Sequence, residues 1–356
     1  MAPALKPNLR CGWTTGACAT AAALAAASAL RAGCFPDPIT IRLPGGQTPS
    51  FALAHRWVDH QCAEAGVIKD AGDDPDVTHG ALIIARVRLL PRGMGLVFKA
   101  GEGIGYVTRL GLPLPPGEPA INAGPQAMIA GNLAAIGVAD AEVVISIPGG
   151  ELLARQTLNG RLGIVGGLSI LGTTGIVVPY SCSAWVHTIH RAIDVARAAG
   201  LDHLAAVTGK TSELGLVTLH PGLTELAVID TGDFVGGFLK YLRRQPVARI
   251  TIAGGFAKLT KLAVGHLNLH SSSSEIDFGW LAGVVATLGG APELEADARS
   301  AVTAFAVLEL AQAAGIPLAD AIAARAMKVA DAAVSGRMAI EVAVFDRNSR
   351  LVGHAQ

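Results

Sequence analysis

Eighteen residues, RLGIVGGLSILGTTGIVV at positions 161–178, constrain the fold of this chain more than any other stretch. They include five glycines, three hydroxyl residues and no acidic residue. Glycine adds backbone freedom that folding must remove, so this run is a poor helix and a poor ordinary strand. We therefore expect its backbone to approach a large ligand or another segment of the chain very closely.

The composition excludes several classes of protein. With 356 residues the chain is long enough for two domains. Its 28 basic and 28 acidic residues balance, which argues against a nucleic-acid binder. We find neither the roughly 18 uninterrupted apolar residues of a membrane helix nor, in residues 1–10, the pattern of a signal peptide. We expect a cytoplasmic protein whose five cysteines, none in a C-x-x-C pair, are ordinary thiols.

The first half predicts a mainly antiparallel α+β domain over residues 1–179. An alanine-rich helix is expected at 16–32 and a second helix at 125–135. Short turns between the β-like segments favour antiparallel pairing. These segments are 39–43, 51–57, 62–69, 82–90, 95–100 and 142–148.

The second half, residues 180–356, predicts a Rossmann-like α/β domain. Strands and helices alternate here, which is typical of a parallel sheet with helices on its faces. The pattern does not decide whether a final strand at 340–345 belongs to this domain or returns to the first. The expected strands are 204–207, 226–229 and 249–252, and the expected helices are 183–199, 234–243, 256–264, 280–288 and 294–314.

Two polar clusters in the first half are candidate sites. Thr14, Thr15 and Gly16 precede the alanine-rich helix, where they form either an anion site or a plain N-cap. The stretch 70–79 holds four aspartates and His79. It fits a hard-metal loop, an Asp-rich turn or an acid/base site. We favour the last, because acids and histidine have no packing reason to gather between apolar strands.

The catalytic candidates within this stretch are His79, Asp74 and Asp73. The glycines of 101–105 also attract attention as a G-x-G-x-G pattern. A dinucleotide-binding turn should lead into a helix, whereas a β-like segment follows here. We therefore interpret 101–105 as a glycine-rich turn near the substrate.

The second half carries the candidates for a nucleotide-like cofactor. Gly209, Asp230, Gly254 and Gly255 follow or end predicted strands, where ligands gather in doubly wound sheets. Asp230 either accepts hydrogen bonds from ribose hydroxyls or caps the next helix. His187 and His190 lie three residues apart on a predicted helix, which suits a surface better than a metal site.

Four long stretches together resemble one family of enzymes. They are LRCGWTTGACATAAALAAA at 9–27, VIKDAGDDPDVTHGALI at 67–83, GEGIGYVTRLGLPLPPGEPAINAGPQAMI at 101–129 and the run at 161–178. They occur in the order found in the cobalt-precorrin-5B C1-methyltransferases, enzymes of corrin-ring (vitamin B12) synthesis, and span about half the chain. Segments 232–239, 253–265 and 268–271 are similar more loosely.

The resemblance implies an S-adenosylmethionine-dependent C-methyltransferase that converts cobalt-precorrin-5B to cobalt-precorrin-6A. Cobalt would belong to the substrate, so no protein metal site is implied. Arginine suits the carboxylates of a tetrapyrrole, and two arginines lie in the family-like stretches. The expected substrate-binding residues are Thr14, Thr15, Gly16, Asp70, Arg109, Arg161, Thr173, Thr174, His270 and Ser271.

Two alternatives of other classes remain open from the residues. One is a nicotinamide-dependent corrin-precursor reductase, suggested by the glycines of the second half. The other is a non-catalytic tetrapyrrole carrier. We expect a small-molecule corrin precursor as the partner, with no nucleic acid and no membrane, and the resemblance is compatible with a homodimer and with transient channelling to other corrin-pathway enzymes.

Overall fold

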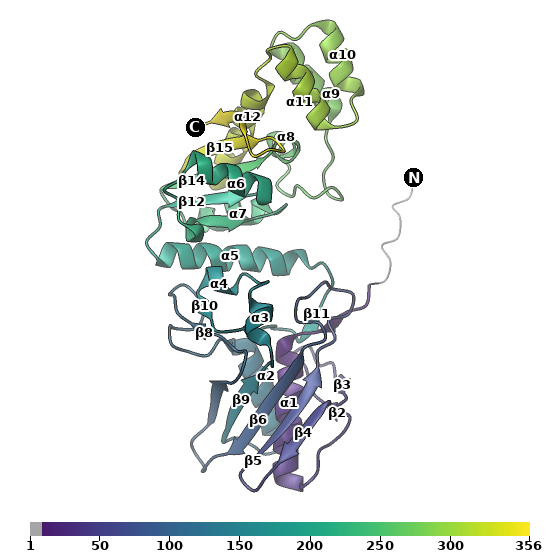
Figure 1. The fold of residues 1–356 in the computed structure, drawn as a ribbon, viewed down its shortest axis with the longest axis vertical. Helices are drawn as coiled ribbons and strands as arrows, with labels where there is room; N and C mark the ends of the chain where they lie inside the picture. The colour runs from purple at the N-terminus through teal and green to yellow at the C-terminus, as the bar shows by residue number, and fades with distance from the viewer. Residues whose placement is uncertain (1–8) are drawn as a thin grey trace. The chain divides into compact units, whose positions relative to one another are not determined.

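The structure, a computed structural model, describes residues 9–356 (Figure 1). The chain divides into two compact units, residues 1–181 and residues 182–356. Both are mixtures of helices and sheets, and the predicted mixed α/β class is confirmed.

The first unit is built on a five-stranded sheet in the order β4-β5-β6-β9-β7. Neighbouring strands are antiparallel except β7 and β9, which are parallel. The strands are β4 (His55–Val58), β5 (Cys62–Ile68), β6 (Leu82–Leu89), β7 (Leu96–Ala100) and β9 (Ala141–Ser146).

Helix α1 (Thr15–Ala32) packs against β5, β6 and the helix α2 (Ala123–Ala135). Alanine at most of its positions lets the helix backbone come close to the sheet, and every residue from Thr15 to Ala27 is buried. Gly33 ends the helix in a left-handed conformation, with φ of 72°. The predicted helix at 16–32 is thus confirmed.

Short strand pairs and helices complete the first unit. They are β1 (Gly12–Trp13) with β11 (Ile176–Val177), β8 (Tyr106–Val107) with β10 (Ile164–Val165), β2 (Ile39–Thr40) with β3 (Ser50–Phe51), and the short helices α3 (Gly150–Ala154) and α4 (Asn159–Leu162).

The second unit contains a five-stranded sheet in the order β13-β12-β14-β15-β16. The first four strands are parallel and β16 is antiparallel to β15. The final strands therefore belong to the second unit. The strands are β12 (His203–Val207), β13 (Val228–Asp230), β14 (Arg249–Gly255), β15 (Ala339–Phe345) and β16 (Leu351–Ala355).

Helices cover both faces of this sheet. Side chains of β12 alternate between a small core that includes Val207 and Leu216 and a larger core that includes Leu204 and Phe238. Helix α6 (Lys210–Leu219) supplies Leu216 to the small core. The larger core gathers residues of α5 (Cys182–Ala198), α7 (Val235–Arg244), α8 (Phe256–Ala263), α9 (Phe278–Thr287), α10 (Pro292–Ser300), α11 (Ala304–Ala313) and α12 (Leu318–Val334).

Several predicted elements differ from the structure. The single helix expected at 294–314 is two helices, because Ala301 is extended and the Thr303 side chain caps α11 by accepting the Ala306 N–H. The strand expected at 226–229 begins only at Val228, after the 3₁₀ turn η1 (Glu225–Ala227). Within residues 9–356, no helix combines the length and apolar character needed to cross a membrane.

Candidate functional site

The loops with the most chemistry in the first unit leave one edge of its sheet. In the strand register, Ile68 lies opposite Leu82 and Ala100 lies opposite Ile145. The carboxyl ends of β5, β7 and β9 therefore meet the start of β6 at this edge, which we call the strand-end edge. The Asp-rich loop (70–79) follows β5, and the glycine-rich turn (101–105) follows β7. As predicted, no helix follows that turn.

The glycine-rich run crosses the strand-end edge from β8 to β1, and we call residues 163–177 the crossing segment. The Leu168 N–H donates to the Gly103 carbonyl at 2.8 Å, and the Ile170 N–H donates to the Ala120 carbonyl at 2.8 Å. Further along, β11 pairs with β1. The crossing segment thus joins parts of the chain that are far apart in sequence.

Glycine is required where the crossing segment meets its neighbours. A Cβ atom at Gly167 would lie 2.3 Å from the Gly103 carbonyl oxygen, and one at Gly172 would lie 2.4 Å from Thr14 Cβ. Gly172 also has a φ of +113°, which side chains rarely adopt. The expected close approach to another segment of the chain is confirmed.

Thr14, Thr15 and Gly16 lie under the crossing segment. Thr14 Oγ1 accepts the Ala17 N–H at 3.1 Å, as an N-cap does, and the Gly16 N–H donates to the Leu171 carbonyl at 3.1 Å. Both threonines are buried. Two N–H groups that an anion site would use therefore have protein acceptors, which favours the N-cap interpretation. Substrate contact by these three residues stays a prediction.

The Asp-rich loop is bonded to residues near the beginning and near the end of the first unit. Asp70 forms an ion pair with Arg10, with Arg10 Nη2 2.9 Å from Asp70 Oδ1, and Asp73 accepts the Arg10 backbone N–H at 2.6 Å. Asp74 accepts the Tyr180 N–H at 2.8 Å. Hydrogen bonds from the Arg10 side chain and a backbone N–H lower the pKa of Asp70 to about 2. Three of the four aspartates thus hold the loop in place.

Lys69 anchors the base of this loop, and the sequence interpretation missed it. Its side chain is 1% exposed, and its Nζ lies 2.6 Å from Asp76 Oδ2. The other oxygen of Asp76 accepts the Thr78 N–H and hydroxyl at 2.7 and 2.6 Å. Burial opposes the charge of Asp76, but these hydrogen bonds outweigh it and lower its pKa. A lysine that ends an apolar strand was the only signal in the sequence.

His79 is held by its own loop. Its Nδ1 accepts the Ala71 N–H at 3.1 Å and lies 3.9 Å from Asp70 Oδ1. A neutral imidazole in this arrangement carries its proton on Nε2, because Nδ1 is the acceptor. Taking a second proton on Nδ1 would break the bond to Ala71. The geometry therefore favours the carboxylates over His79 as proton acceptors.

Arg109 contacts the backbone of Arg161, and carboxylate binding by the two residues stays a prediction. Arg109 Nη1 donates to the Arg161 carbonyl at 3.1 Å, and the Arg109 side chain covers Gly163, where φ is +81°. On the same crossing segment, Thr174 Oγ1 accepts the Ile176 N–H at 3.2 Å. Thr173 and Thr174 belong to the crossing segment, and Arg161 lies at the end of α4, just before that segment in the chain.

The four predicted cofactor residues of the second unit gather where its strand order reverses. The chain leaves β12 for β13 on one side and then returns to β14 on the other. At this switch point the Thr208 N–H donates to the Ala253 carbonyl at 3.0 Å, and a Cβ at Gly254 would lie 2.9 Å from Thr208 Oγ1. Gly209 and Gly255, which precede α6 and α8, have open space where a Cβ would point.

The other predicted polar residues of the second unit have local partners. Asp230 Oδ1 accepts the Gly232 N–H at 3.0 Å, a turn contact that uses one of its two oxygens. His270 and Ser271 lie in an exposed turn, in which His270 Nδ1 is 2.8 Å from Ser272 Oγ. His190 stacks on Tyr241, with ring centroids 4.1 Å apart, and burial lowers its pKa.

A cluster around Glu341 was not predicted. Glu341 is 2% exposed in the apolar strand β15, and its carboxylate lies within 2.8 Å of His220 Nε2, His354 Nε2, Arg249 Nη2 and Thr251 Oγ1. A lone acid in the sequence AIEVAVF was the available signal. His203 and His220 also line a hollow next to this cluster.

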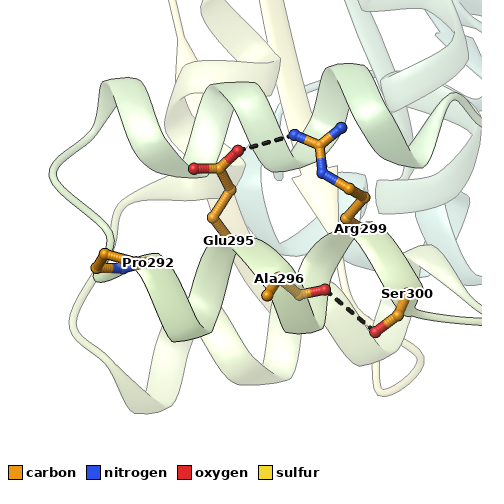
Figure 2. Close-up of a pocket in the computed structure, with 5 residues that line it drawn as sticks. All are labelled: Pro292, Glu295, Ala296, Arg299 and Ser300. Carbon is orange, nitrogen blue, oxygen red and sulfur yellow. Dashed lines mark hydrogen bonds and ion pairs between the residues drawn. The ribbon is translucent and has the colours of Figure 1, made fainter.

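Figure 2 shows another hollow, on α10, whose lining includes Glu295, Arg299 and Ser300. Arg299 Nη2 pairs with Glu295 Oε1 at 2.8 Å, one helical turn away. None of the predicted site residues lies in it. Among residues 9–356, no group of three or more histidines, cysteines and acids is arranged to hold a metal ion.

The fold, the strand-end edge and the switch point define a two-unit α/β protein. One unit carries clustered acids and arginines, and the other carries glycine-rich strand ends with open space beside them. The CbiD family model matches residues 3–179, and the model of the CbiD C-terminal domain matches residues 268–356. The chain belongs to this family, the cobalt-precorrin-5B C(1)-methyltransferases.

Relatives of that name match nearly the whole chain. The protein of Bradyrhizobium sp. is 56% identical over 98% of this chain and 94% of its own length. That of Rhodospirillum rubrum is 57% identical over 97% of both chains. The crystal structure of a cobalamin biosynthesis protein (cbiD) from Archaeoglobus fulgidus is 28% identical over 70% of this chain and 77% of that one, with a TM-score of 0.39.

Proposed function

We propose that this protein transfers a methyl group from S-adenosylmethionine to C1 of cobalt-precorrin-5B, giving cobalt-precorrin-6A in corrin biosynthesis. The proposal is carried by sequence identity: the chain is 52–57% identical, over nearly its full length, to relatives named for this reaction. Cobalt enters as part of the substrate. We further assign an α+β domain to residues 1–179 and a Rossmann-like domain to residues 180–356.

The reaction places modest demands on the protein. The sulfonium of the donor makes its methyl group a strong electrophile, so no covalent nucleophile is needed. Catalysis then depends on orienting the ring carbon and excluding water. Side chains that bind charged groups on both reactants are therefore the ones to look for.

We assign the donor to the switch point of the second unit. Gly209 and Gly255 leave open space at the starts of α6 and α8, and Gly254 lets the ends of β12 and β14 approach closely. Asp230 has one carboxylate oxygen engaged in its turn, so the other suits ribose hydroxyls. These features fit a nucleoside-bearing ligand at the carboxyl ends of parallel strands.

We assign the corrin precursor to the strand-end edge of the first unit. Its acetate and propionate groups suit Arg109 and Arg161, which are joined by a hydrogen bond from the Arg109 side chain to the Arg161 carbonyl. Thr173 and Thr174 of the crossing segment offer hydroxyls on the same edge, together with Thr14, Thr15, Gly16 and Asp70. His270 and Ser271 remain candidates in the second unit.

The ring system takes up a positive charge together with the methyl group. It must therefore lose a proton if the product is to be neutral. We propose Asp74 or Asp73 of the Asp-rich loop as the acceptor, with His79 as the less suited third candidate. Asp74 and Asp73 each accept a backbone N–H, which fixes their carboxylates in position.

Methyl transfer from labelled donor tests the proposed function. The purified protein, cobalt-precorrin-5B and S-adenosylmethionine with a labelled methyl group should yield a labelled corrin and S-adenosylhomocysteine. A reductase would instead require NADPH and transfer no label. A carrier would bind the pigment and leave the donor unchanged, and either result would refute the proposal.

A further inference from the structure

Lys258 occupies the switch point of the second unit and contacts the ends of two strands. It lies in the first turn of α8, directly after β14. Its Nζ donates to the Thr208 carbonyl at 2.5 Å, just past β12, and forms an ion pair with Asp233 Oδ1 at 2.9 Å, just past β13. One ammonium group therefore joins two strand ends at the switch point, to which we assign the methyl donor.

This ion pair retains capacity for a ligand. An ammonium has three N–H donors and a carboxylate has two oxygens. The contacts to Thr208 and Asp233 use two of the donors and one of the oxygens. Within residues 9–356 neither group forms another hydrogen bond, and the two side chains are 36% and 25% exposed. A positive and a negative group thus lie side by side at the switch point.

We propose that the Lys258–Asp233 pair binds the amino-acid end of S-adenosylmethionine, with Lys258 on its carboxylate and Asp233 on its ammonium. This inference rests on the proposed function. A free amino acid carries both charges on one carbon, and few other parts of a small ligand present opposite charges so close together. The ribose and adenine are uncharged and are left to Asp230 and the open glycines.

The partial burial of the pair makes this recognition effective. Hydrogen bonds between charged groups are about twice as strong as neutral ones. Charges that are partly shielded from solvent are screened less by salt than exposed ones. Thr208 is itself buried, which holds the carbonyl that orients the ammonium. Lys258 and Asp233 are then residues that select the donor by its amino-acid end.

Calorimetric titration with two ligands tests the inference without requiring activity. S-adenosylhomocysteine keeps the amino-acid end, whereas 5′-methylthioadenosine lacks its carboxylate and ammonium. Lys258→Met should weaken binding of S-adenosylhomocysteine by about tenfold or more, because it removes a charged hydrogen bond. Its affinity for methylthioadenosine should stay within roughly twofold, and Lys258→Arg should restore much of the loss. Asp233→Asn should give the same pattern.

Lys240→Met is the matched control, because Lys240 is an exposed lysine of the neighbouring helix α7. It should bind both ligands like the unsubstituted protein, and circular dichroism should show every variant folded. Equal losses for both ligands, or no loss with Lys258→Met, would overturn the inference. If methylthioadenosine binds too weakly to measure, the contrast between Lys258→Met and Lys258→Arg decides. Failure of the unsubstituted protein to bind S-adenosylhomocysteine would refute the donor itself, not only its contact with Lys258.

Discussion

A single buried carboxylate, that of Glu341, links four neighbours in the second unit. Burial alone would raise its pKa, but hydrogen bonds from Thr251, His354, Arg249 and His220 outweigh burial and lower it to about 2. A carboxyl group whose folded pKa is depressed stabilises the fold above its unfolded pKa, near 4.5. That contribution is lost as the pH falls from about 4.5 towards 2.

Glu341→Gln tests this account. The neutral amide leaves Arg249 without its buried counter-charge, so we expect the free energy of unfolding at pH 7 to fall by about 2–4 kcal/mol. The loss should shrink as the pH falls towards 2, where the native carboxylate is protonated too. Urea unfolding followed by circular dichroism at several pH values measures both effects. An equal difference at every pH would contradict the assigned charge.

The proton acceptor of the Asp-rich loop can be identified by replacing each of three candidates with asparagine. Asp74→Asn keeps an oxygen for the Tyr180 N–H and removes the charge, so a catalytic base at Asp74 predicts a single-turnover rate about 100-fold lower. His79→Asn keeps an acceptor for the Ala71 N–H and should change the rate by less than about threefold. Asp73→Asn tests the other candidate carboxylate in the same way. A full rate with both aspartates replaced in turn would remove them from catalysis.

The types of residue in the sequence predicted part of the candidate site. The rest could not be predicted, because it depends on contacts between residues far apart in the chain. The sequence shows four aspartates together between apolar strands, and the structure places them in one fastened loop. The sequence does not show that Arg10, sixty residues earlier, pairs with Asp70. Nor does it show that the two histidines beside Glu341 come from separate parts of the chain. Such contacts join residues that are far apart in the chain, and no local pattern of residues specifies them.

At the scale of elements, the crossing segment depends on close backbone contact. Gly167→Ala would place a methyl group 2.3 Å from the Gly103 carbonyl oxygen, so the backbone must shift. We expect about 1–3 kcal/mol of destabilisation, as for other overpacked sites. Gly131→Ala is the control, because this helical glycine of α2 has nothing within 4 Å of the added Cβ. It should be neutral or stabilising by up to about 1 kcal/mol. In thermal unfolding, the melting temperature should therefore fall for Gly167→Ala and stay unchanged or rise for Gly131→Ala.

Element prediction succeeded where periodicity or composition was strong. The alanine-rich α1 and the alternating strands and helices of the second half appear near their expected places. Helices α6 and α12 were not predicted. In α6, glycine and two threonines weaken the helical pattern, and burial of Leu216 against the sheet supplies what propensity does not. The break between α10 and α11 depends on a threonine cap within an otherwise helical composition.

At the scale of the whole molecule, we assign the donor to one of the two units. We therefore expect S-adenosylhomocysteine, the product formed from the donor, to change hydrogen exchange in that unit alone. A ligand that binds only the folded state stabilises it by about 2.7 kcal/mol at 100 times its dissociation constant. We expect S-adenosylhomocysteine to slow hydrogen exchange at 208–209, 230–233 and 254–258, all in the second unit. Exchange measured by mass spectrometry, with and without the ligand, tests this. Protection confined to residues 9–181 would contradict the assigned donor site.

The pairing of β1 with β11 bears on how the first unit is made. The hydroxyl of Thr15 and the backbone of Leu171 are 156 positions apart, and Trp13 pairs with Ile176. A chain emerging from the ribosome therefore has its first helix long before the residues that secure the start of that helix. Until residue 177 has been synthesised, the start of α1 lacks its partners in the crossing segment, and the nascent chain exposes apolar surface that is prone to aggregation.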